Sequence, residues 1–262
     1  MKIDLTGKYA LVGGATGGIG KAIALVLAEC GAQVYLMARN KEKLQHTLQE
    51  LNADKGQAHD MIITDFMDYE NHKLILQKFF RNHHVDILIN NTNGPTSGEI
   101  ESKSEDDYLE AFNLLFQNAV FTSNLALDHM KRQGYGRIIN ISSLTVKEPQ
   151  DSLILSNTMR IALVSWCKSL ANAVASKGIT VNSIMTGYFA TDRLYSLMET
   201  QAKKQGIPMS DVERTRIQSI PAKRLGDPKE YGYLAAFLAS PLASYLTGSS
   251  IPLDGGLSKS VF

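Results

Sequence analysis

The chain has 262 residues, a formal net charge of +1 and an apolar content of 44%. These totals fit one α/β domain, and no linker or composition shift divides residues 1–262. The small, dispersed charge gives no reason to expect nucleic acid or an anionic membrane as partner. The N-terminus shows no signal-peptide core, no apolar run near it approaches the roughly 20 residues of a membrane span, and Cys30 and Cys167 fall in predicted helices. We therefore expect a cytoplasmic protein in a reducing compartment.

Residues 9–20 pass from an apolar run through a glycine-rich turn into helical periodicity. Tyr9 to Val12 predicts a buried strand, and apolar residues recur from Ile19 on one helix face. Glycines permit positive φ and let a pyrophosphate approach the backbone beside the helix N-terminus. A flexible loop without a ligand is the alternative. The predicted phosphate-binding residues are Gly14, Thr16, Gly18, Ile19 and Gly20.

The spacing of Gly14, Gly18 and Gly20 resembles the turn of the short-chain dehydrogenase/reductase family, which reads Thr-Gly-x-x-x-Gly-x-Gly. Gly13 stands where that family usually has Thr or Ser. Strands alternate with helices along the whole chain, which predicts a parallel sheet covered on both faces. The resemblance implies a single-domain, doubly wound Rossmann fold with a mainly parallel seven-stranded sheet.

The second strand is predicted over 31–39. In dinucleotide-binding folds, the end of this strand faces the adenosine ribose of the cofactor. An acid at this end binds the 2′-hydroxyl of NAD, whereas Arg accommodates the 2′-phosphate of NADP. Ala38 occupies the place of the acid and Arg39 follows it. We therefore expect NADP(H) as cofactor, although Arg39 could merely solvate a strand end.

The remaining elements continue the alternation of strands and helices. Strands are predicted over 61–65, 85–91, 137–142, 178–184 and 249–253. Helices are predicted over 41–52, 70–82, 104–131, 153–176 and 228–239.

Two of these strands end in further candidate cofactor residues. Asp65 resembles the family's adenine-binding aspartate, with Phe66 beside it, but Asp65 could equally cap a helix. The fourth strand continues as Asn-Asn-Thr-Asn-Gly94 where the family has Asn-Asn-Ala-Gly. The resemblance implies that Asn91 and Thr92 line the adenosine ribose in an altered loop, although the asparagines could simply satisfy strand-end backbone groups.

The resemblance also implies hydride transfer between nicotinamide and a carbonyl or alcohol carbon, aided by Ser, Tyr and Lys. Ser143 takes the place of the orienting serine at the end of the fifth strand. The family's spacing then puts Ser156 at the tyrosine position and Arg160, which also grips the nicotinamide ribose, at the lysine position. An aliphatic hydroxyl is a far weaker acid than a phenol with its pKa near 10, and Arg stays protonated. With Ser156 and Arg160 in these places, the site can still stabilise a negative charge on the substrate oxygen, but it lacks the family's usual proton donor.

Two residues are candidates for restoring proton transfer. Tyr188 could donate the proton, or it could form only a wall of the substrate pocket. The family's middle-helix Asn falls at Leu115, whereas Asn118 lies on the same face one turn further on. We take Asn118 as the candidate relay residue.

The segment after the sixth strand resembles the family's nicotinamide loop, with Thr186 replacing its Pro. The resemblance assigns cofactor contacts to Gly187, Phe189 and Thr191. A helical, charged insertion over 192–223 leaves the carboxyl edge of the sheet, which predicts a substrate lid. The alternative for this insertion is an oligomer contact.

No metal is expected, because the pair His83-His84 has no neighbouring carboxylate or cysteine in the sequence. The family commonly forms tetramers through the long middle helix and the helix after Ser156, where Leu163, Trp166 and Leu170 form an apolar face. We therefore expect a homotetramer or a homodimer.

The sequence as a whole favours an NADP(H)-dependent oxidoreductase similar to 3-oxoacyl-[acyl-carrier-protein] reductases, acting on a carbonyl or alcohol substrate such as a 3-oxoacyl thioester. A catalytically impaired NADP(H)-binding sensor or scaffold is the alternative. A lyase or isomerase that uses the cofactor only as scaffold is a third, weaker hypothesis.

Overall fold

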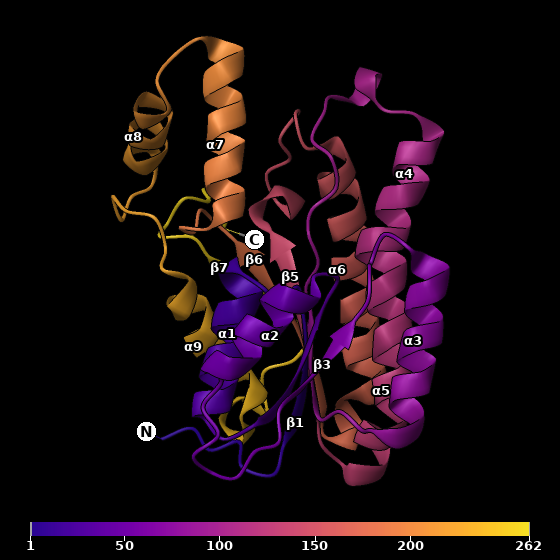
Figure 1. The fold of residues 1–262 in the computed structure, drawn as a ribbon. Coiled ribbons are helices and arrows are strands. Elements are labelled where there is room, and N and C mark those ends of the chain that lie inside the picture. The colour runs from indigo at the N-terminus through magenta and orange to yellow at the C-terminus, as the bar shows by residue number, and fades with distance from the viewer. Residues whose placement is uncertain (1, 262) are drawn as a thin grey trace.

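The computed structural model describes residues 2–261 as a seven-stranded sheet covered by helices on both faces (Figure 1). The strands are β1 (Tyr9–Gly13), β2 (Gln33–Ala38), β3 (Asp60–Ile63), β4 (Ile87–Asn90), β5 (Gly136–Ser143), β6 (Ile179–Thr186) and β7 (Ser250–Leu253). Their order is β3-β2-β1-β4-β5-β6-β7, and every pair is parallel. The predicted doubly wound fold is confirmed, and its sheet is wholly parallel.

The order reverses between β1 and β4, and ligands of such sheets bind beyond the carboxyl ends of the strands at that point. The helices are α1 (Gly18–Glu29), α2 (Lys41–Glu50), α3 (Tyr69–Asn82), α4 (Glu105–Phe112), α5 (Asn118–Gln133), α6 (Ile154–Val174), α7 (Asp192–Gln205), α8 (Met209–Ser219) and α9 (Pro228–Ala239).

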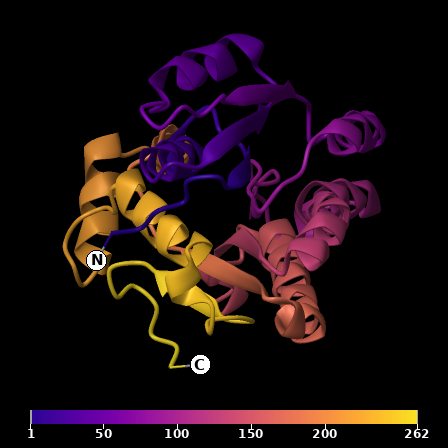
Figure 2. The ribbon, with the colours of Figure 1, turned by 90° about the horizontal axis from the view of Figure 1, so that it is seen from below.

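The strands are apolar along their length because helices cover both faces. Successive side chains of β1 show this: Leu11 belongs to one apolar cluster and Val12 to the other. The cluster that contains Val12 lies beneath α1, α2 and α9, and the cluster that contains Leu11 lies beneath α3, α5 and α6. Figure 2 shows the two helical layers from the lower end of the sheet.

The helix predicted over 104–131 is divided in the structure. Ser104 caps α4 through a reciprocal capping box with Asp107, as the first-turn acids indicate. A π-helical turn over Asn113–Gln117 then separates α4 from α5. Such turns are rare and occur frequently at functional sites, and this one precedes Asn118 directly.

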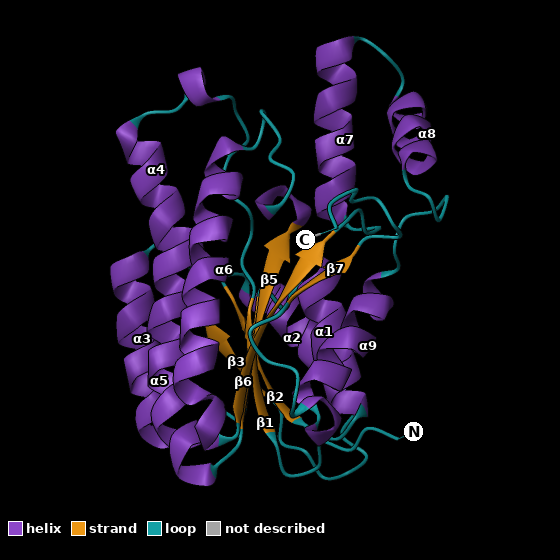
Figure 3. Ribbon diagram, turned by 180° about the vertical axis from the view of Figure 1, so that it is seen from behind, coloured by secondary structure: helices purple, strands orange, loops and turns teal. Residues whose placement is uncertain are grey.

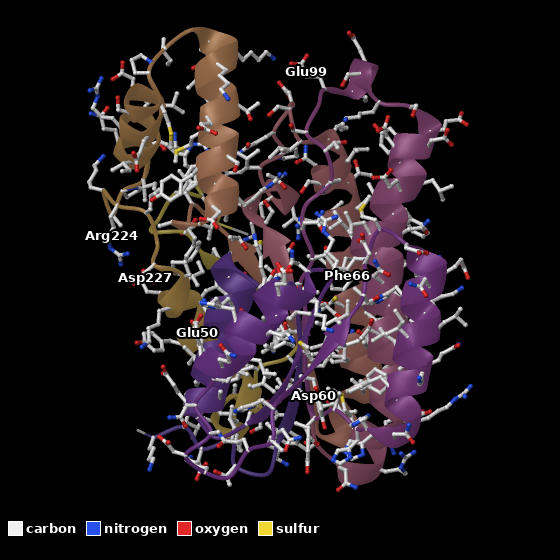
Figure 4. The ribbon with its side chains drawn as sticks, in the orientation of Figure 1. Glu50, Asp60, Phe66, Glu99, Arg224 and Asp227 are labelled. Carbon is white, nitrogen blue, oxygen red and sulfur yellow. The ribbon has the colours of Figure 1, made fainter. Side chains whose placement is uncertain are left out.

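The predicted insertion over 192–223 contains α7 and α8, which stand beyond the carboxyl ends of the strands (Figures 1 and 3). The two helices share a small apolar cluster of Leu194, Met198, Ala202 and Val212. Arg224 pairs with Glu230 where this segment returns to α9, and Asp227 caps that helix (Figure 4). Across the described residues, no helix combines the length and apolarity that a membrane crossing requires.

Candidate functional site

The glycine-rich turn adopts the conformation that its sequence predicts. Gly14 and Gly18 have φ angles of +59° and +49°, which side chains rarely adopt. Gly17 begins α1 with no side-chain cap, so no side chain competes for the first-turn N–H groups. A Cβ atom added at Gly20 would overlap the carbonyl oxygen of Gly14. The N-terminus of α1 is therefore open to an anion.

The asparagines after β4 fix the position of this turn. The Asn91 amide donates to the carbonyl of Gly13 at 2.9 Å, and a Cβ atom at Gly13 would overlap the Asn91 backbone. The Asn90 amide donates to Asn140 on β5. Asn91 thus satisfies a strand-end backbone group, as the alternative interpretation states, whereas Asn90 donates to the side chains of Asn140 and Ser123. Thr92 follows them, and its hydroxyl donates to the carbonyl of Asn93.

Arg39 and Asp65 lie together at the ends of β2 and β3. Their charged atoms are 3.7 Å apart, and the side chains are 69% and 40% exposed. An exposed pair at this distance contributes little stability, so Arg39 can turn towards a phosphate. Asp65 also accepts a hydrogen bond from the Met67 backbone, but it does not cap α3, because the N-cap of that helix is Asp68. Phe66 is buried beside them (Figure 4).

The residues after β6 lie against the glycine-rich turn. Gly187 donates its N–H to Leu253, and a Cβ atom there would lie 2.6 Å from Cα of Asp254. Thr191 caps α7, and its methyl group would be 3.1 Å from a Cβ atom at Gly18. The start of α7 thus closes one side of the predicted cofactor site. Phe189 is buried deeper, against Tyr231.

Ser156 and Arg160 are in direct contact. The Arg160 Nε donates to the Ser156 hydroxyl at 3.1 Å, and its Nη1 donates to the Ile141 carbonyl at 2.5 Å. Burial lowers the pKa of Arg160, and the positive charge of Arg193 acts in the same direction. The guanidinium nevertheless stays charged in the physiological range. The pair thus joins α6 to the end of β5.

Ser143 ends β5 opposite Thr186 of β6, at the same edge of the sheet. Its hydroxyl accepts a hydrogen bond from the Thr145 backbone. Among the described residues, Ser143 and Ser156 share no hydrogen bond: Ser143 is bonded to Thr145 and Ser156 to Arg160.

Tyr188 lies beside α7 and α8. Its ring packs against the α7–α8 cluster, and the Arg216 guanidinium stands 4.7 Å above it. This position favours the pocket-wall interpretation of Tyr188 over proton donation.

Asn118 lies beside a small pocket. Its amide nitrogen donates to the Phe66 carbonyl at 2.8 Å, whereas its buried Oδ1 has no partner in the described part of the chain. The pocket measures about 20 Å³ and is also lined by Arg160, Asn90 and Thr122. That volume suits one water molecule, with Asn118 and Arg160 as polar partners.

Sequence reasoning missed Thr186, Tyr231 and Arg193. The Thr186 hydroxyl donates to the Ser142 carbonyl and lies 3.0 Å from the Tyr231 hydroxyl, so it ties the strand ends to α9. Burial raises the pKa of Tyr231, which keeps its phenol protonated. Arg193 reaches from α7 to the Pro95 carbonyl at 3.5 Å. No local sequence pattern predicts a role for Tyr231. Arg193 closely follows the predicted nicotinamide loop, and this position is a signal that it lies near the site.

Two sequence interpretations need correction. Leu163 is 5% exposed and belongs to the core, so it cannot form part of an exposed apolar face. The statement that the His83-His84 pair has no neighbouring carboxylate is also wrong, because Asp86 and His129 lie beside His84.

Comparison with known proteins supports the interpretation of this edge of the sheet as a reductase site. A family model described as enoyl-(acyl carrier protein) reductase matches residues 14–258. The NADPH-dependent reductase BacG of Bacillus subtilis is 34% identical, over 97% of this chain and 99% of that protein. The 3-oxoacyl-[acyl-carrier-protein] reductase FabG of Vibrio cholerae is 33% identical, over 97% of this chain and 99% of that protein.

Solved structures agree with these relatives. L-sorbose reductase from Gluconobacter frateurii, solved with NADPH and L-sorbose, superposes with a TM-score of 0.92 at 27% identity, over 100% of both chains. YwfH, an NADPH-dependent reductase of bacilysin biosynthesis, superposes with a TM-score of 0.90 at 33% identity, over 97% of this chain and 99% of that one. Fold, glycine-rich turn and relatives all agree, and the chain belongs to the short-chain dehydrogenase/reductase family.

Proposed function

We propose that this protein is an NADP(H)-dependent oxidoreductase that reduces small carbonyl compounds at an atypical Ser143, Ser156 and Arg160 site. The observation that carries the proposal is the Ser156–Arg160 contact at the carboxyl edge of the sheet. This contact keeps a hydroxyl and a fixed cation in the positions that the family gives to its tyrosine and lysine. A pocket with no catalytic role would not require a hydroxyl and a cation at these two positions.

NADP(H) suits the residues of the turn and of the β2 end. The uncapped start of α1 offers N–H groups to a pyrophosphate, and Arg39 offers a cation where NAD-binding chains carry an acid. Several relatives are NADPH-dependent reductases by name or were solved with NADPH, which supports the same cofactor here. When bound, the reduced nicotinamide supplies the hydride.

The side chains of the site would orient the substrate carbonyl, stabilise the developing negative charge and supply the proton. Ser143 and Ser156 orient the carbonyl oxygen by hydrogen bonds, and Arg160 stabilises the negative charge that grows on that oxygen. Arg160 cannot relay a proton, because it stays protonated. Ser156 is too weak an acid to be the proton source, so water held near Asn118 supplies the proton. Ser156 relays it, giving its hydroxyl proton to the oxyanion as it takes one from that water, and bulk solvent restores the proton to the water.

The substrate that this account favours is a small ketone or a 3-oxoacyl thioester. The FabG relatives reduce 3-oxoacyl groups by name, and the sorbose reductase was solved with a ketose. The α7–α8 segment over 192–223 would act as the lid that covers either kind of substrate. Its length and its own apolar cluster support this role, because a lid must keep its shape while it moves.

Assembly into a homodimer or homotetramer through α5 and α6 also fits the structure. Trp166 and Leu170 lie four positions apart on α6 and are only partly buried, so an apolar pair remains on one face of this helix without Leu163.

The test follows NADPH oxidation with acetoacetyl thioesters and a panel of small ketones. The natural chain is compared with a Ser156→Tyr, Arg160→Lys double variant and with Tyr188→Phe. We expect turnover by the natural chain, no gain from the double variant, and a kcat of Tyr188→Phe close to that of the natural chain. Loss of about 100-fold or more in Tyr188→Phe would identify Tyr188 as the proton donor. Turnover seen only in the double variant would favour the NADP(H)-binding sensor or scaffold.

A further inference from the structure

Three titratable side chains meet at the end of the sheet opposite the cofactor turn. His84 follows the end of α3, Asp86 precedes β4, and His129 lies on α5. They lie next to the start of β1, because Asp86 accepts a hydrogen bond from the Tyr9 backbone at 2.9 Å. This is the lower end of the sheet in Figure 1, away from the lid. The proposed reduction uses none of these residues.

The distances among the three side chains suit a small cation. One ligand atom from each residue lies within 4.8 Å of the others. His129 Nε2 is 3.3 Å from Asp86 Oδ1. Two ligands at about 2.0–2.1 Å from a tetrahedral zinc ion are themselves about 3.3–3.4 Å apart. The His129–Asp86 pair already has this spacing, and the exposed His84 can approach it by side-chain rotation.

We propose that His84, Asp86 and His129 form a binding site for a divalent transition-metal ion of the zinc type. Two imidazoles and a carboxylate form a ligand set that zinc accepts, with the fourth position left to water. The Tyr9 N–H holds the other carboxylate oxygen of Asp86, which is the kind of outer contact that orients metal ligands. Exposed His84 leaves a path for the ion.

The two imidazoles already lie side by side. The His84 and His129 rings stack with their centroids 4.2 Å apart.

A bound ion would join three elements that are distant along the chain: the α3–β4 junction, the start of β1 and α5. Its effect would be on stability, because the site lies at the opposite end of the strands from Ser156 and Arg160. The proposal is therefore independent of the reductase activity.

The test titrates the untagged chain with Co²⁺ and then with Zn²⁺. We expect one tetrahedral Co²⁺ site per chain in the visible spectrum, displacement of Co²⁺ by Zn²⁺, and a higher Tm with metal. His84→Ala and His129→Gln should each weaken Co²⁺ binding at least tenfold. His83→Ala is the matched control, because His83 stacks on Phe79 outside the cluster and should leave binding unchanged.

Three results would overturn the proposal: no Co²⁺ binding up to millimolar concentration, equal binding by His84→Ala, or loss of binding in His83→Ala. Because His84 is exposed, its variant should fold normally. Far-ultraviolet circular dichroism of each variant checks this point, so a loss of binding by His129→Gln alone is not confused with unfolding.

Discussion

At the scale of single residues, the phosphate turn is the most tightly determined part of the site. Gly20 faces the Gly14 carbonyl and the Asn91 amide with no room for a methyl group. Because both neighbours are fixed by the strands, they cannot yield without distortion of the turn. The identity of Gly20 therefore follows from packing, in addition to any need of the cofactor.

We predict that Gly20→Ala lowers NADPH affinity at least tenfold, because the turn must open to admit the methyl group. Fluorescence titration with NADPH measures this change, and thermal unfolding reports whether the fold survives. Gly17→Ala provides the comparison, since its Cβ would meet no atom of the chain within 4 Å. Gly17→Ala should keep the natural Tm, so any loss of affinity there reports close approach of the phosphate. Unaltered affinity in Gly20→Ala would show that the turn is not the phosphate site.

Of the candidate catalytic residues, only the Ser156–Arg160 pair could be expected from the sequence to be in contact. Ser156 and Arg160 are four positions apart on one helix, so helical geometry alone brings them together. The sequence does not predict that Tyr231 and Arg193 lie near the site, because their positions depend on how α9 and α7 pack against the sheet. Tyr188 shows the same limit, since its place in the chain does not reveal that its ring packs against the α7–α8 cluster.

At the scale of elements, the boundaries that the sequence predicted best have capping signals. Helix α9 begins at Pro228 after the Asp227 cap, as predicted, and Ser104 marks the start of α4. The π-helical turn before Asn118 could not be predicted, because its residues are as apolar as those of an ordinary helix. The cluster around His84 could be predicted only in part, because Asp86 lies two residues after His84 in the sequence whereas His129 comes from a distant helix.

At the scale of the whole molecule, one buried histidine links α3 to the sheet and makes stability depend on pH. His72 is fully buried, its Nδ1 lies 2.9 Å from the Thr64 hydroxyl, and its Nε2 has no partner among the described residues. Burial lowers its pKa from 6.5 to about 4. Between these values the unfolded chain binds a proton that the folded chain does not.

We therefore predict that the free energy of unfolding decreases as the pH falls from about 6.5 to about 4, by up to about 3 kcal/mol from this residue. Urea unfolding at several pH values measures the slope. His72→Phe should flatten this part of the profile, even though it leaves the Thr64 hydroxyl without its partner and lowers stability near pH 7. An equal slope in His72→Phe would assign the pH dependence to other groups.

The central claim is that a site with Ser156 and Arg160 in place of the family's Tyr and Lys still transfers hydride from NADPH to a carbonyl carbon. The most direct measurement follows deuterium from each C4-deuterated stereoisomer of NADPH into the alcohol product by mass spectrometry. We expect one deuterium on the new carbinol carbon from one stereoisomer and none from the other. Tight binding of NADPH, with no deuterium in any product of the ketone and thioester panel, would contradict the claim.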